Sequence, residues 1–184
     1  MKRIGSVEEM HATWQLLRRT ARVMGKARQK ELDEYDISGD ATAVMFTIVQ
    51  LGEEAIPAEI ARRLLLEPHS VSQLVTRLQK DGLARRVRDL DVKNRVRIEL
   101  TKQGKELFRK AMIRRSVRKM MSVLTDQERE QLWNSLAKLR EAALKQIGMK
   151  QRSSYPPSDR RSLFCDPEKP GKAANADKHL LGVE

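Results

Sequence analysis

Apolar residues recur every three or four positions through the first part of the chain, and this spacing predicts amphipathic helices. A long first helix is predicted over about residues 7–35, because Ser6 and Glu9 have the spacing of a capping box and an apolar stripe follows. That stripe consists of Met10, Trp14, Leu17, Ala21 and Met24. Residues 38–40, Ser-Gly-Asp, interrupt the pattern, and a second helix is predicted over residues 41–51. Its expected buried face consists of Val44, Ile48 and Leu51.

Two prolines mark the starts of two shorter helices. Proline lacks a backbone amide hydrogen, and at the first helical position that hydrogen would have no acceptor within the helix. The predicted helices begin at Pro57 and Pro68, and the second ends near Asp81, before Gly82 as a left-handed cap. Their expected inward residues are Ile60, Ala61, Leu64, Val71, Leu74, Val75 and Leu78. A short helix, a brief turn and a second helix in this order predict a helix-turn-helix.

From Leu83 onward apolar and polar residues alternate, which is the two-residue period of a β-strand. Strands predicted over about residues 83–88 and 95–100 pair across a loop that contains Asp89, Asp91 and Asn94. Because this hairpin directly follows the helix-turn-helix, the predicted arrangement is a winged helix-turn-helix.

Helical periodicity returns after the hairpin. Helices are predicted over about residues 102–121 and 125–147, and a second capping box begins at Thr125. The apolar stripe of the last helix consists of Leu132, Leu136, Leu139, Ala143 and Ile147. Residues 149–184 are rich in Ser, Pro, Gly and charge, and are predicted to form a disordered tail. The predicted fold class is therefore mainly α with a small β-hairpin, in one domain over residues 1–148.

The charge balance favours a polyanionic partner. The 184 residues include 37 Lys and Arg against 25 Asp and Glu, a net charge of +12, and residues 1–148 alone carry +10. No apolar stretch approaches the roughly twenty residues of a membrane span, and the N-terminus lacks the apolar core of a signal peptide. The single cysteine, Cys165, excludes an intramolecular disulfide. These features predict a cytoplasmic protein with no membrane partner.

One face of the helix predicted from Pro68 is suited to reading double-stranded DNA, because hydroxyls, amides and cations bond to base edges and phosphates. The candidate residues there are Ser70, Ser72, Gln73, Thr76 and Arg77. Val71 is also a candidate, because it lies near the N-terminal end of the helix, although its spacing puts it on the inward stripe. The N-terminal end of such a helix enters the groove most deeply, whereas Arg77 is placed to meet a phosphate. An ordinary solvated helix face is the alternative, and the neighbouring basic hairpin favours recognition.

The hairpin itself carries six Lys and Arg between residues 85 and 97, opposed there only by Asp89 and Asp91. Its candidate DNA contacts are Arg86, Arg88, Lys93 and Arg95. Lys93 and Arg95 lie near the loop tip, from which a cation can enter a narrow minor groove. The alternative is that charge keeps an edge hairpin from aggregating, and both readings can hold together.

Two stretches resemble a known family. Residues 70–83, Ser-Val-Ser-Gln-Leu-Val-Thr-Arg-Leu-Gln-Lys-Asp-Gly-Leu, and residues 98–104, Ile-Glu-Leu-Thr-Lys-Gln-Gly, resemble the MarR family of winged-helix transcription factors. The second stretch looks like that family's Leu-Thr-x-x-Gly junction. The resemblance implies a homodimer, with dimerisation helices over about residues 7–35 and 102–147 and a DNA-binding part over about 41–101.

The resemblance also assigns individual residues. It implies that Arg95 is the wing arginine, although Asn94 stands where the family usually has aspartate. The residues that it matches to the family's DNA-contacting stretch are Ser70, Val71, Ser72, Gln73 and Arg77. Many members release DNA when a small-molecule effector binds. Candidates for lining an effector pocket are Trp14, Met24 and Met45, for which an ordinary core position is the alternative.

Other functions fit the sequence less well. The three histidines, His11, His69 and His179, have no metal-ligand spacing, and neither a phosphate-binding glycine loop nor a nucleophile elbow occurs. We therefore predict no enzyme activity, cofactor or metal. A winged helix that binds protein rather than DNA has no need of so basic a hairpin, and RNA readers use stacking aromatics that are scarce here. The predicted function is a repressor that binds a pseudo-palindromic operator as a homodimer.

Overall fold

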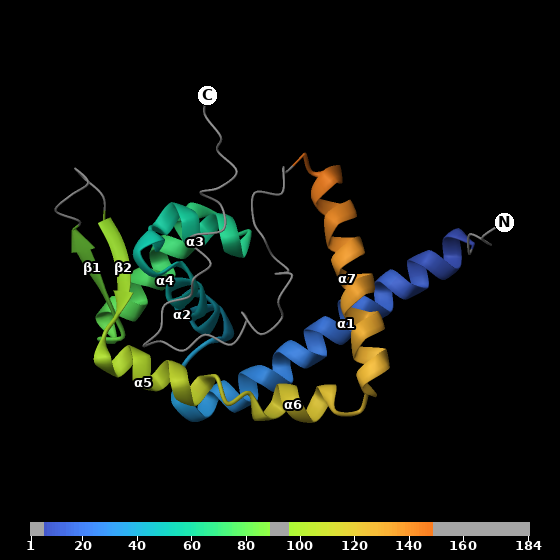
Figure 1. The fold of residues 1–184 in the computed structure, drawn as a ribbon, viewed down its shortest axis with the longest axis horizontal. Coiled ribbons are helices and arrows are strands. Elements are labelled where there is room, and N and C mark those ends of the chain that lie inside the picture. Colours follow the sequence, from blue (N-terminus) through green and yellow to red (C-terminus); the bar gives the residue numbers. More distant parts are fainter. Residues whose placement is uncertain (1–5, 89–95, 149–184) are drawn as a thin grey trace.

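The computed structural model describes residues 6–88 and 96–148, and these form a mainly helical fold with one two-stranded antiparallel sheet (Figure 1). The α-helices are α1 (Val7–Leu32), α2 (Gly39–Leu51), α3 (Pro57–Leu64), α4 (Pro68–Lys80), α5 (Lys102–Ala111), α6 (Arg115–Met121) and α7 (Asp126–Gln146). The strands are β1 (Ala84–Arg88) and β2 (Val96–Leu100), and short 3-10 helices are η1 (Asp33–Tyr35) and η2 (Gly52–Glu54). This confirms the predicted fold class. No helix in the described part of the chain is long and apolar enough to span a membrane.

One hydrophobic core joins α2, α3, α4, the hairpin and α5 into a compact lobe (Figure 1). Most of the side chains at its centre are those that the periodicity predicted to face inward, and Met45 and Phe108 join them. Fully buried members include Val44, Met45, Leu51, Ile60, Val71, Val75, Leu78, Ile98 and Phe108. Each buried side chain of this size stabilises the fold by about 1.5–3 kcal/mol relative to exposure. The lobe is therefore the rigid support on which the surface residues of α4 and the hairpin are carried.

The helix boundaries follow the predicted signals. Ser6 accepts the amide of Glu9, whose carboxylate accepts the amide of Ser6, so the predicted capping box forms at the start of α1. Pro57 and Pro68 occupy the first turns of α3 and α4. Gly82 follows α4 with φ +72°, a backbone conformation that glycine adopts without strain. The turn to β1 is thus encoded locally.

The hairpin pairs Ala84 with Leu100 and Arg88 with Val96 in antiparallel register. The backbone amide of Ile98 also donates to the carbonyl of Ala55, at 2.8 Å, which attaches β2 to the segment between α2 and α3. This bond anchors the hairpin to the lobe.

The junction between β2 and α5 explains why glycine stands at position 104. Thr101 caps α5 by accepting the amide of Gly104 at 3.0 Å, and its hydroxyl donates to the carbonyl of Gly82 at 2.6 Å. The amide of Thr101 donates to the carbonyl of Leu83, at 3.0 Å. A Cβ on Gly104 would lie 1.9 Å from that same Leu83 oxygen. Only a residue without a side chain permits this approach.

One sequence prediction about the fold is wrong. The helix expected over residues 102–121 is two helices, because α5 ends at Ala111 and α6 begins at Arg115. Between them Arg114 adopts a left-handed conformation with φ 53°, which is uncommon for a residue that is not glycine. No glycine or proline marks the break, so the sequence contains no local signal for it.

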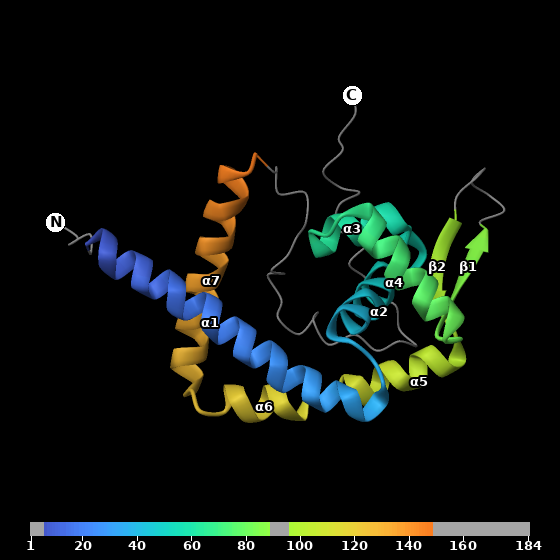
Figure 2. The ribbon, with the colours of Figure 1, turned by 180° about the vertical axis from the view of Figure 1, so that it is seen from behind.

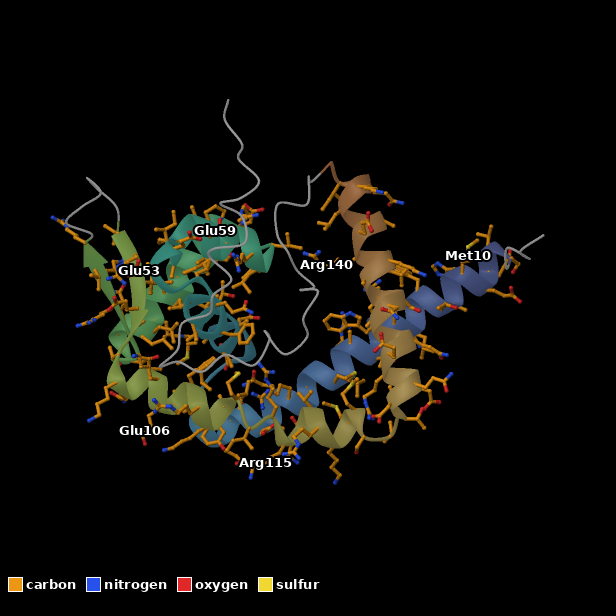
Figure 3. All side chains as sticks on the ribbon, in the orientation of Figure 1. Met10, Glu53, Glu59, Glu106, Arg115 and Arg140 are labelled. Atoms are coloured by element: carbon orange, nitrogen blue, oxygen red, sulfur yellow. The ribbon has the colours of Figure 1, made fainter. Side chains whose placement is uncertain are left out.

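The first part of α1 and all of α7 extend away from the lobe (Figures 1 and 2). Met10 lies toward the outer end of α1 (Figure 3). Both helices expose most of the apolar stripes that the sequence predicted for them. The exposed apolar residues of α1 are Val7, Met10, Trp14, Leu16, Leu17 and Val23, and those of the last helix and its end are Leu132, Leu136, Leu139 and Ile147. Within the described protomer, these stripes do not contribute to the main core.

Candidate nucleic-acid interface

Helix α4 places its polar candidates on the surface because its apolar stripe is held in the core. Val75 and Leu78 are buried, while Ser72, Gln73, Thr76 and Arg77 are exposed and Ser70 is half-buried. The exception is Val71, whose side chain is fully buried. The DNA contact predicted for Val71 is therefore not retained, since its methyl groups pack inside the lobe. The other residues form one outward polar face.

A side-chain pair orders the start of this face. The amide nitrogen of Gln73 lies 2.9 Å from Nε2 of His69, one helical turn earlier. Residues four apart on a helix are surface neighbours, so the pair can form without cost to the helix. This contact restricts the conformations of the Gln73 amide, so a ligand that bonds to the amide would cost less side-chain entropy. The sequence prediction did not include His69 in the site, and the four-residue spacing is the signal that identifies it.

The hairpin lies beside α4, and a hydrogen bond joins the two. Nε of Arg86 donates to the side-chain oxygen of Gln79, at 3.1 Å. Arg88, two residues further along β1, is on the same face of the strand and is exposed. Gln79 was not predicted as part of the site, and it orients a predicted wing arginine relative to the recognition helix.

The opposite face of the hairpin is occupied by an internal ion-pair network. Glu99 accepts from Arg85 at 2.9 Å and also bonds to Arg97. These two arginines border a groove of about 730 Å³ between the end of α2, the hairpin and the start of α5. Because a carboxylate of the same chain already engages them, this face is less suited to a phosphate than the Arg86 and Arg88 face.

Several predicted positions lie outside the described residues. They are Lys93, Arg95 and Asn94 in the hairpin loop, and residues 149–184. Among the pocket candidates, Met45 is a fully buried core residue, whereas Trp14 is 48% exposed. Neither Trp14, Met24 nor Met45 lines the groove behind the hairpin.

The fold and this surface together define a class of protein: a winged helix-turn-helix with an exposed polar face on α4 and a basic hairpin beside it. Comparison with known proteins gives the family. Residues 35–93 match the MarR family. A curated relative, the uncharacterized HTH-type transcriptional regulator YsmB of Bacillus subtilis, is 27% identical over 125 residues, which cover 67% of this chain and 85% of that protein.

Solved structures agree. The organohalide-sensing transcriptional regulator RdhR, in its 2,4-dichlorophenol-bound form, is 32% identical with a TM-score of 0.66, over 78% of this chain and 89% of that one. The MepR–DNA complex of S. aureus has the same fold at 22% identity and a TM-score of 0.63, over 70% of this chain and 96% of that one. The chain belongs to the MarR family, a family of DNA-binding transcriptional regulators.

Proposed function

We propose that the protein represses transcription by binding a pseudo-palindromic operator as a homodimer, with α4 in the major groove and the hairpin against the adjoining backbone. The observation that carries the proposal is the outward polar face of α4, joined through Gln79 to Arg86 of the basic hairpin. In this arrangement Ser70, Ser72, Gln73 and Thr76 meet base edges or nearby phosphates. Arg77, Arg86, Arg88, Lys93 and Arg95 supply positive charge to the phosphate backbone.

The experiment that tests this function is selection from random duplexes followed by fluorescence-anisotropy binding across a salt series. We expect a palindromic consensus, tight binding to it, and a steep fall in affinity as salt rises, because phosphate contacts release counterions. Equal, weak binding to selected and scrambled duplexes would contradict sequence-specific recognition. No binding even at low salt would favour a protein-interaction module instead.

Two substitutions on the same helix face should distinguish a residue that recognises bases from one that contacts the phosphate backbone. Gln73→Ala is expected to weaken binding to the selected operator about tenfold or more and to leave binding to a random duplex nearly unchanged, since an amide reads a base edge. Arg77→Ala is expected to weaken both to a similar degree and to lower the salt slope by about one, since it contacts a phosphate. Equal losses on both duplexes for the Gln73 variant would contradict its role.

The dimer part of the proposal is supported by the exposed stripes of α1 and α7. Trp14 is 48% exposed, Leu136 39% and Leu139 56%, all on helices that extend from the lobe. Contiguous exposed apolar surface on a soluble protein marks an interaction site. We propose that a second copy covers it, so that α1, α6 and α7 form the dimerisation region, whereas α5, which was predicted with them, packs Phe108 into the core of the lobe.

Leu136→Glu tests this assignment. The variant should raise the dissociation constant of the dimer about a hundredfold or more, because a carboxylate would be buried in an apolar interface. Sedimentation equilibrium measures the constant. Lys138→Glu is the control, because residue 138 lies about 200° around the helix from residue 136. If the Leu136 variant dimerises as tightly as the wild type, the assigned interface is wrong.

We further propose that a small-molecule effector releases the protein from its operator. The support is the relative RdhR, whose structure was solved with 2,4-dichlorophenol bound. Adding that compound and related phenols to the anisotropy assay tests the proposal, and a ligand-dependent loss of operator binding is the expected result.

A further inference from the structure

The described part of the chain buries a single charged residue, Glu31, which is 6% exposed at the end of α1. Its carboxylate faces the start of α6, which is more than eighty residues away in the sequence. It accepts the backbone amide of Arg115 at 2.8 Å, the backbone amide of Ser116 at 3.0 Å, and the hydroxyl of Ser116. A carboxylate bonded to the free amides at the start of a helix is a favourable cap.

Arg28, one turn before Glu31, joins the same cluster. One guanidinium nitrogen lies 2.7 Å from the Glu31 carboxylate, and another donates to the carbonyl of Ala111, at 2.5 Å. Ala111 is the last residue of α5. The end of α1 therefore binds both ends of the break between α5 and α6, with a cation at the C-terminus of one helix and an anion at the N-terminus of the next.

The break is held from the lobe as well. The guanidinium of Arg114, the left-handed residue between the two helices, lies over the ring of Phe46 in α2, 5.4 Å from its centroid. A residue keeps such a conformation only where its surroundings impose it. The angle between α5, which belongs to the lobe, and α6, which continues toward α7, is thus set by contacts from α1 and α2 (Figure 3, at Arg115).

From this geometry we propose that Glu31 and Arg28 are positioning residues that determine the operator half-site spacing the dimer accepts. The proposal rests on the homodimeric operator binding proposed above. In a dimer joined through α1, α6 and α7, the angle at the break sets how far apart the two α4 helices lie. One added base pair displaces a half-site by about 3.4 Å and rotates it by about 34°, so a rigid angle makes the protein selective for one spacing.

The test compares operators whose half-sites are separated by the selected spacing and by one base pair more or fewer. Wild type is expected to bind the altered operators at least about tenfold more weakly. Glu31→Gln removes the charge that caps α6 and pairs with Arg28, and should reduce that penalty to about threefold or less because the lobes adapt at the break. Glu34→Gln is the matched control, because Glu34 carries the same charge one turn later, is 55% exposed and pairs with Arg115 only at the surface.

A purely structural role for Glu31 would lower stability and active fraction but would leave the ratio of affinities between spacings unchanged. Ser116→Ala deletes only the hydroxyl donor, so it should reduce the ratio of affinities between spacings by less than Glu31→Gln does. It replaces the Glu31 variant in the test if that variant does not fold. The inference is overturned if both variants lose as much affinity as the wild type when the half-site spacing is changed. It is also overturned if the wild type binds all spacings equally well. Failure of the wild type to select any operator overturns the proposed function itself.

Discussion

Replacing Gly104 with alanine is expected to lower the free energy of unfolding by at least about 3 kcal/mol. The new Cβ would lie 1.9 Å from the carbonyl oxygen of Leu83 and 2.9 Å from its carbonyl carbon. That backbone cannot yield cheaply, because the Leu83 oxygen accepts the amide of Thr101 and the Leu83 amide donates to Leu78. The variant must therefore pull α5 away from the hairpin or distort the end of α4.

Equilibrium unfolding in urea, followed by circular dichroism, measures this loss. Gly25→Ala is the matched control, because Gly25 lies inside α1 and a Cβ there meets nothing within 4 Å. That change should be neutral or stabilise by about 0.5–1 kcal/mol, since alanine favours a helix interior. A Gly104 variant as stable as the wild type would show that the close approach to Leu83 is not a constraint.

Replacing Glu31 with alanine should cost about 3–5 kcal/mol at neutral pH, the range observed when one member of a buried ion pair is removed. The substitution removes the charge partner of Arg28 Nη1. It also removes the acceptor of the Arg115 and Ser116 amides and of the Ser116 hydroxyl. Urea unfolding of both proteins measures the difference.

The effect should depend on pH in a defined window. Burial alone would raise the pKa of the Glu31 carboxyl, but hydrogen bonds from Ser116, Arg28 and Arg115 outweigh it and lower the pKa from 4.5 to about 2. The folded state thus binds this proton less readily than the unfolded state. The stabilisation is complete above pH 4.5 and is lost as the pH falls toward 2. The difference between wild type and variant should shrink across that interval, whereas a constant difference would contradict the assigned pKa.

Most elements of the lobe were predictable because their signals are local. The prolines at positions 57 and 68, the capping box at Ser6 and the left-handed Gly82 each act within a few residues. The alternation in β2 predicted that Ile98 faces the core, and it is fully buried. The spacing of apolar residues already determines which side of a helix or strand is buried, so these predictions did not require tertiary contacts.

The candidate site was predictable only in part. The polar face of α4 follows from its period, but Val71 lies on the buried stripe and its predicted DNA contact is not retained. The pairing of His69 with Gln73 is local and readable from the four-residue spacing. The bond between Arg86 and Gln79 is not, because it depends on how the hairpin packs against α4.

The sequence by itself determined the winged-helix order of elements, the basic hairpin and the exposed polar face of α4, because periodicity, caps and charge are encoded residue by residue. Only the tertiary structure decided where the helix after the hairpin breaks and why Gly104 is required. The break depends on Arg28 and Glu31 of α1, and the glycine on the carbonyl of Leu83. Each is a contact between distant segments, and its energy exists only once folding has brought those segments together.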